Sequence, residues 1–451
     1  MNDKLKDSLS ENNALTIEKE TIWLSKLIDH RLESFFENKK FKNLDAPILT
    51  DDESNYAKFI KNNHLNFLER LTLIVSISVF FSPQIFDRFL IKNKVLDRPF
   101  TEFGGYIDPV NNFFKPTLQT VTFINFGLDF LGKLKFQTLF DDDHVFKKEN
   151  ILLLENYNKN ISYLSASISL TPEFIQYITL GTKFRPKYST NFPANRLTTE
   201  LNWENLILSE NIMNELDTIN TWICSNDIID ENKNLRTKIN KGFKALLYGP
   251  PGTGKTLTAA LLGKKNNIDV YRIDLSQLVS KYIGETEKNL SMIFDMAENK
   301  NWILFFDEAE SLFSKRTKVS DSKDKFANQQ TAYLLQRIEN YKGLVILATN
   351  LKPNIDSAFS RRLQSVILYN LPNKSQRIQL WENALNGISK LDKSDIKYIS
   401  ENFNLSGGSI KNVVQYAWLK SLKKESDINK NDLIFGIKRE LIKEGKIFDL
   451  K

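Results

Sequence analysis

A short segment of the sequence, from Tyr248 to Ala259, has the residue types and spacing that hold a polyphosphate. It reads YGPPGTGKTLTA, in a chain with only 17 Gly and 12 Pro. The segment fits the pattern G-x-x-x-x-G-K-[ST], in which inward-facing backbone N–H groups cradle phosphate oxygens. Glycine is the residue that adopts such a loop geometry without a side-chain clash. We therefore predict an ATP-binding loop made of Gly249, Pro250, Pro251, Gly252, Thr253, Gly254, Lys255 and Thr256.

Two side chains of this loop have specific tasks in the prediction. Lys255 reaches the β and γ phosphates, and the hydroxyl of Thr256 ligates Mg²⁺. The helix expected to follow directs its positive N-terminal end at the same anion. The alternative is a glycine-rich turn without a ligand. The strand-like run KALLY before the loop and the helical sequence after it favour the phosphate site.

The segment WILFFDE, from Trp302 to Glu308, supplies carboxylates at the end of an apolar run. Asp307 is a candidate ligand for Mg²⁺, and Glu308 can polarise the water that attacks ATP. Taken alone, such a run is more often a strand followed by a helix cap. Downstream of a phosphate loop, in an alternating α/β pattern, the catalytic interpretation is favoured.

The elements that would position these residues follow from the hydrophobic pattern. Five short apolar runs alternate with amphipathic segments, which predicts a parallel five-stranded sheet with helices on both faces. After Pro372 the sequence is typical of helices only, which indicates a small helical lid. The predicted strands are ALLYG, DVYRIDL, WILFFDE, GLVILATN and SVILY.

The N-terminal part is an α+β region with less regular patterning. Thr171 and Pro172 indicate a helix start, and a winged helix is one interpretation of the residues around them. The run containing Pro186 and Pro193 is expected to be a connector. The predicted organisation is therefore a mixed helical, aromatic-rich domain at 1–150, a winged-helix-like unit with linker at 151–200, a nucleotide-binding α/β domain at 201–371 and a helical lid at 372–451.

Composition limits the remaining classes of function. The chain has 62 Lys+Arg and 55 Asp+Glu, but the two signs are interspersed, so nucleic-acid binding is not favoured. Cys224 is the single cysteine, which excludes an intrachain disulfide and fits a reducing compartment. The apolar stretch Leu71 to Phe86 is too short to span a bilayer and is expected to be a buried helix. We therefore expect a cytoplasmic protein without a membrane span.

From about Trp203 to the C-terminus the sequence resembles the AAA+ ATPases of the AAA group. The motifs GPPGTGKT and FFDEAESLF carry this resemblance. It implies a ring, typically a hexamer, that hydrolyses ATP with Mg²⁺ and acts on a protein substrate.

The same resemblance assigns further positions. Asn350 matches the sensor-1 residue that orients the lytic water, and Arg361 and Arg362 match arginine fingers that act on a neighbouring subunit's ATP. Tyr282 and Ile283 match the pore loop that grips an extended polypeptide. Without the resemblance, Asn350 would be interpreted as a turn residue and Tyr282 as a core residue. Arg361 and Arg362 would be interpreted as a solvated helix end.

For two further segments, the sequence allows two interpretations each. The stretch 314–330 is either the second pore loop or a charged, solvated loop. The segment LSGGSIKNVV lacks the Gly-x-Arg motif of sensor 2, so Gly407, Gly408 and Ser409 are expected near the ribose. The alternative is that Lys411 takes the role of the missing arginine.

Residues 95–445 further resemble the AAA+ ATPases encoded in gene clusters for phage-tail-like extracellular contractile injection systems. That resemblance implies a role in assembling the particle or loading its cargo, with components of the system as partners. The competing hypotheses are an ATP-dependent assembly scaffold and a DNA-linked motor. The motor hypothesis draws on the basic pI of about 9.0 and on the winged-helix interpretation.

Overall fold

The structure of the chain is a computed structural model. It describes residues 2–141, 144–155, 162–182, 185–189, 192–225, 228, 238, 241–275, 285–310, 322–351, 361–389, 391–424 and 427–445. The chain forms two compact units, Met1–Arg185 and Pro186–Lys451. The predicted boundaries at residues 150 and 200 therefore differ from the single division in the structure.

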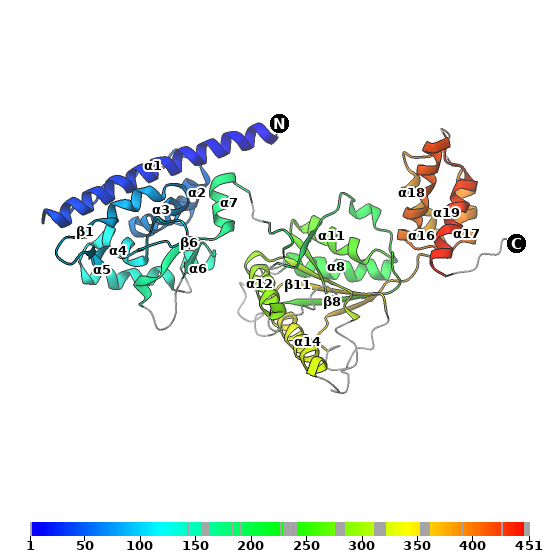
Figure 1. The fold of residues 1–451 in the computed structure, drawn as a ribbon. Coiled ribbons are helices and arrows are strands. Elements are labelled where there is room, and N and C mark those ends of the chain that lie inside the picture. Colours follow the sequence, from blue (N-terminus) through cyan, green and yellow to red (C-terminus); the bar gives the residue numbers. More distant parts are fainter. Residues whose placement is uncertain are drawn as a thin grey trace. The chain divides into compact units, whose positions relative to one another are not determined.

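Unit 1 is built from helices and short two-stranded hairpins around an aromatic core. Its long first helix, α1, covers many of the elements that follow (Figure 1). The elements are α1 (Asn2–Phe36), α2 (Asn55–Asn62), α3 (Phe67–Phe81), η1 (Pro83–Leu90), β1 (Lys92–Asn93), β2 (Arg98–Pro99), η2 (Thr101–Phe103), β3 (Tyr106–Ile107), β4 (Phe114–Lys115), α4 (Leu118–Phe126), α5 (Phe130–Lys135), η3 (Phe136–Phe140), α6 (Val145–Lys148), β5 (Leu152–Glu155), η4 (Tyr163–Ser165), β6 (Ser167–Leu170) and α7 (Pro172–Leu180), where η marks a 3-10 helix.

The predicted winged-helix-like unit is part of unit 1 and not a separate domain. Strands β5 and β6 form an antiparallel pair, and Ile168, Phe174 and Ile178 belong to the core of unit 1. The expected helix start is present, since the hydroxyl of Thr171 accepts a hydrogen bond from the N–H of Phe174 at 3.4 Å. Helix α7 packs on α1 and α2. The short unit therefore completes the core of the first unit.

The most apolar segment of the chain forms α3, whose residues from Leu71 to Ser78 are buried. The helix ends at Phe81, before Pro83 starts η1. Among the described residues, no single helix is long and apolar enough to cross a membrane. Together α3 and η1 have the length and composition, but the chain bends by 101° between them.

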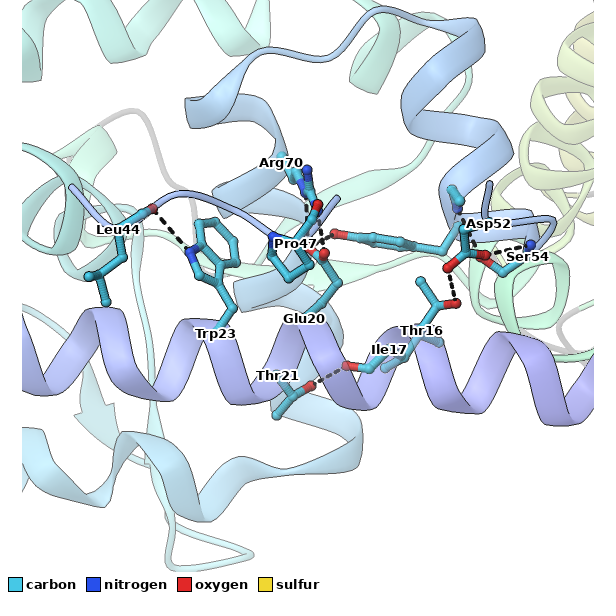
Figure 2. A network of polar contacts seen from close by, with 12 residues as sticks. Thr16, Ile17, Glu20, Thr21, Trp23, Leu44, Pro47, Asp52, Ser54 and Arg70 are labelled. Carbon is cyan, nitrogen blue, oxygen red and sulfur yellow. Dashed lines mark hydrogen bonds and ion pairs between the residues drawn. The ribbon is translucent and has the colours of Figure 1, made fainter. Parts of the chain in front are cut away.

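A buried ionic network ties α1 to the elements that follow it (Figure 2). The carboxylate of Glu20 is fully buried and accepts hydrogen bonds from the Tyr56 hydroxyl at 2.9 Å and from Nε of Arg70 at 3.0 Å. Arg70 also donates to the carbonyl of Pro47 at 2.7 Å. Because a buried carboxylate without partners is very costly, this network fixes the register of α1 against α2 and α3.

Unit 2 contains a six-stranded sheet with the strand order β12-β8-β11-β10-β9-β7. Five strands are parallel and coincide with the five predicted apolar runs, which confirms the predicted sheet. They are β8 (Phe243–Tyr248), β9 (Val270–Asp274), β10 (Ile303–Asp307), β11 (Leu344–Thr349) and β12 (Ser365–Leu368).

The sixth strand, β7 (Asn195–Leu197), was not predicted. It lies in the expected connector and pairs antiparallel with β9 at the edge of the sheet. Arg196 of β7 also donates to the carboxylate of Asp269 at 2.7 Å. The sheet is therefore mixed, and part of the connector belongs to the nucleotide-binding fold.

Helices cover both faces of the sheet, as the pattern predicts (Figure 1). One core contains side chains of α8 (Glu210–Cys224) and α11 (Lys255–Asn266), and the other contains side chains of α12 (Glu285–Lys300) and α14 (Ser322–Asn340). A short 3-10 helix, η5 (Trp203–Asn205), precedes α8.

The predicted helical lid is present at the end of unit 2. Its helices pack around a separate core that includes Trp381, Ile399 and Val413. They are α16 (Lys374–Leu385), α17 (Lys393–Asn402), α18 (Gly407–Lys424) and α19 (Lys430–Lys443).

Candidate nucleotide-binding site

The predicted phosphate loop connects the end of β8 at Tyr248 to the start of α11 at Lys255. Its glycines Gly249, Gly252 and Gly254 have φ values of 141°, 73° and 104°, which L side chains rarely adopt. A Cβ added to Gly249 would lie 2.0 Å from the carbonyl oxygen of Tyr369. The loop therefore needs glycine for its backbone conformation and for its close contact with the chain after β12.

We expect Gly249→Ala to lower the apparent melting temperature of the chain and to weaken ATP binding. The left-handed conformation costs on the order of 1–3 kcal/mol, and the contact with Tyr369 adds a clash. Gly387→Ala is the matched control, because Gly387 has a φ of 73° and no atom within 4 Å of the added Cβ. Thermal unfolding of both variants measures the difference. An equal loss for both would show that the contact with Tyr369 contributes nothing.

Lys255 is the first residue of α11 and is buried under the loop. Its ammonium donates to the carbonyls of Gly249 at 2.7 Å and Pro250 at 3.0 Å, and to Oδ1 of Asn350 at 2.9 Å. Burial lowers the pKa of Lys255, while the nearby Asp307 carboxylate acts in the opposite direction. The side chain is therefore held in place by three oxygens at the centre of the loop.

Asp307 and Glu308 lie where β10 ends, at the same edge of the sheet as the phosphate loop. The Asp307 carboxylate pairs with Arg272 of β9 at 2.9 Å and accepts the backbone N–H of Glu308 at 3.1 Å. Glu308 has a φ of 54°, an uncommon conformation for a residue other than glycine. Sequence reasoning did not identify Arg272 as the partner of Asp307.

A cavity of about 1280 Å³ gathers most of the predicted residues. Residues Pro251 to Thr256 of the loop line it, together with Asp307 and Asn350. The lid contributes Gly407, Gly408 and Lys411. The cavity joins groups from the loop, from the ends of β10 and β11 and from the start of α18, although these lie far apart in the sequence.

The lid contacts the phosphate loop directly. The backbone N–H of Gly408 donates to the carbonyl of Gly252 at 2.9 Å. Beside it, the hydroxyl of Ser406 accepts the N–H of Ser409 at 3.2 Å and so caps the start of α18. A Cβ on Gly408 would lie 3.0 Å from Cα of Gly252, so the small residues allow this close approach.

Sequence reasoning missed the apolar wall of the cavity. Leu206, Ile207 and Leu208, which precede α8, line it together with apolar residues of the lid such as Leu380 and Val414. An apolar wall beside a phosphate loop suits the flat ring of a nucleotide base. The run LIL after Trp203 was the available signal, but three apolar residues without a known place in the fold predict no role.

The remaining predicted residues that the structure describes do not line this cavity, and they include Gly249, Pro250 and the predicted base Glu308. Arg361 and Arg362 occupy an exposed turn before β12 and do not line the cavity, and Nε of Arg362 is 3.3 Å from the carboxylate of Glu339. Tyr282 and Ile283 lie outside the described residues. Of the stretch 314–330, residues from Ser322 onward belong to α14, so this part is a helix and not a loop.

Comparison with known proteins gives the class of this module. Residues 245–371 match the profile of the AAA family, described as "ATPase family associated with various cellular activities (AAA)". Together with the loop geometry, this match identifies a domain of the AAA ATPase family in the chain.

Three curated relatives match about the same share of the chain. ATPase family gene 2 protein of Schizosaccharomyces pombe is 33% identical over 41% of this chain and 24% of its own length. Proteasome-activating nucleotidase of Methanothermobacter thermautotrophicus is 30% identical over 43% of this chain and 51% of its own. Cell division protein C of Sulfolobus acidocaldarius is 34% identical over 40% of this chain and 51% of its own length. The matched region spans at most about half the length of these relatives.

Among solved structures, the FIGL-1 AAA domain in complex with ADP is similar to part of this chain. The match covers 54% of this chain and 85% of the FIGL-1 chain, with 23% sequence identity and a TM-score of 0.45.

Proposed function

We propose that the protein is a cytoplasmic, ring-forming ATPase, most simply a hexamer, that uses Mg²⁺-dependent ATP hydrolysis to remodel or thread a protein substrate. The observation that carries the proposal is the convergence of Lys255, Thr256, Asp307 and Asn350 on one cavity with an apolar wall. Within the scheme, the loop amides and Lys255 bind the triphosphate, Glu308 takes the proton of the attacking water, and Asn350 orients that water.

The oxygen groups at the cavity fit a magnesium site. Thr256 and Asp307 both line it, and hydroxyl and carboxylate oxygens are ligands that Mg²⁺ accepts. These two residues would hold the ion, which would neutralise charge on the β and γ phosphates. Arg361 and Arg362, which lie away from the cavity of their own chain, would complete the site of a neighbouring protomer.

The direct test is phosphate release by the purified chain at increasing protein concentration, with Mg²⁺ or with EDTA. Turnover per chain should rise with concentration, because the site is completed only in the ring, and EDTA should abolish it. A chain that stays monomeric with Mg·ATP, or whose turnover is independent of concentration, would contradict the proposal.

Tyr282→Ala separates a threading enzyme from the ATP-dependent assembly scaffold of the second hypothesis. A threading enzyme should lose protein remodelling in this variant while keeping its rate of ATP hydrolysis, because an aromatic side chain grips a polypeptide without contacting the nucleotide. If the protein is only a scaffold, the substitution should change neither ATP hydrolysis nor any effect on the test protein. The measurements are unfolding of a fluorescent test protein and ATP hydrolysis, made on the same preparation. Intact remodelling in Tyr282→Ala would exclude the threading role of this residue.

The sequence resemblance to ATPases of contractile injection system clusters supports a finer proposal, a role in particle assembly or cargo loading. To identify partners, the Glu308→Gln variant is purified in its ATP-bound form and the proteins that co-purify with it are identified by mass spectrometry. Sheath, tube or cargo subunits recovered with it would support this role, and their absence would leave a general protein remodeller. DNA binding that weakens strongly with salt would instead favour the DNA-linked motor.

A further inference from the structure

The turn that carries Arg361 and Arg362 is fixed to the strand that leads into the phosphate loop of the same chain. Gln364 makes the connection at two points. Its N–H donates to the carbonyl of Lys244 at 3.0 Å, and its side-chain Oε1 accepts the N–H of Lys244 at 2.7 Å. The regular pairing of β12 with β8 begins one residue later, at Ser365 and Ala245. The side chain of Gln364 therefore extends the ladder by one residue, up to the turn.

Lys244 is a rigid anchor for this connection. Its side chain is buried, and the ammonium donates to the carbonyl of Tyr341 at 3.0 Å, at the end of α14. Burial lowers the pKa of Lys244 to about 8. With its main chain bonded to Gln364 and its side chain bonded to Tyr341, Lys244 has little freedom to move. A residue clamped to it is held with the same precision.

The other described contacts of the turn are a partly buried leucine and an exposed ion pair. Leu363 packs against the core between the sheet and α12 and α14, and Arg362 pairs with Glu339, but both side chains of that pair are about half exposed. An exposed ion pair contributes little to holding a geometry. Among the described contacts of the turn, the clamp made by Gln364 is the one that ties it to β8 by hydrogen bonds.

We propose that Gln364 is a positioning residue for Arg361 and Arg362, which presents them to the ATP of a neighbouring protomer. This inference rests on the proposed function, in which these arginines act in trans. Rates are sensitive to such placement, because a displacement of about 1 Å can lower turnover about 100-fold. The clamp also links the arginines to the chain's own phosphate loop, since β8 ends at Tyr248 beside Gly249.

The test uses Gln364→Leu, which removes the acceptor at nearly constant volume, and Gln364→Glu, which keeps an oxygen at the same place. We expect Gln364→Leu to lower kcat for ATP hydrolysis at least 10-fold, with ATP affinity close to the parent and a melting temperature lower by only a few degrees, because the N–H of Lys244 loses its acceptor. Gln364→Glu should retain most of the parental kcat. A parental kcat in Gln364→Leu, or an equal loss in both variants, would overturn the inference.

Mixed rings distinguish positioning from a structural defect. Lys255→Ala chains should bind ATP about 100-fold more weakly but present intact arginines. Gln364→Leu chains should bind ATP but present misplaced arginines, so ATP is supplied at a concentration that fills only these chains. Mixing the two should therefore raise hydrolysis above the sum of the separate preparations. Arg362→Ala mixed with Lys255→Ala is the reference. If the reference pair also fails to gain activity, the action in trans is wrong. If only the Gln364→Leu pair fails, the positioning role is wrong.

Discussion

Replacing Glu308 with Gln is expected to lower the steady-state rate of ATP hydrolysis roughly 100- to 10,000-fold, the usual contribution of a general base. The amide cannot take the proton of the attacking water, whereas the phosphate loop and Lys255 are unchanged, so ATP should still bind. Gln and Glu both have an unbranched Cβ, so the positive φ of 54° at this position has about the same conformational free-energy cost for both residues. The measurement is phosphate release alongside retention of labelled ATP.

Glu310→Gln is the matched control for this experiment. It makes the same chemical change two residues further along the same segment, and we expect its hydrolysis rate to stay within a few-fold of the parent. If Glu308→Gln hydrolysed ATP at the parental rate, another group would be the base. An equal loss in both variants would point to a general effect of removing negative charge near Lys255.

Replacing Lys255 with Ala is expected to weaken ATP binding about 100-fold, since a hydrogen bond between charged groups contributes up to about 3 kcal/mol. The ammonium lies at the centre of the loop, held by Gly249, Pro250 and Asn350, and its charge is little screened because it is buried. Equilibrium binding of a fluorescent ATP analogue measures the loss.

Lys264→Ala provides the control on the same helix. Lys264 is an exposed residue of α11 whose ammonium donates to the carbonyls of Glu200 and Leu201, away from the phosphate loop. We expect ATP affinity in this variant to equal that of the parent. Equal losses in both variants would mean that α11 as a whole had been perturbed, and unchanged affinity in Lys255→Ala would exclude the assigned site.

The nucleotide-binding sheet could be predicted because its signals are local. Each parallel strand is a continuous apolar run, since both faces of the sheet are covered, and the glycines of the phosphate loop mark a backbone that other residues rarely adopt. Strand β7 escaped prediction because its three residues, Asn195 to Leu197, are not buried and carry no such run. The antiparallel edge strand depends on pairing with β9, which a local pattern cannot show.

Unit 1 could not be predicted for a related reason. Its core is assembled from phenylalanines on many short elements, including Phe89, Phe103, Phe114 and Phe123, which contact one another across long separations in the sequence. The ionic partner of the buried Glu20 lies 50 residues away at Arg70. Such pairings are decided by tertiary packing, so local propensity indicates the helices but not their arrangement.

The edge strand β7 has a mechanical consequence. The chain that leaves unit 1 is hydrogen-bonded to β9 before it reaches the rest of the ATPase module, and Arg196 adds an ionic attachment to Asp269. A pull on the chain ahead of the sheet would therefore load the three-residue pairing of β7 with β9, and β9 lies next to β10, which carries Asp307. Through this pairing, strand β7 would pass force within unit 2 to the strands that hold the predicted nucleotide site.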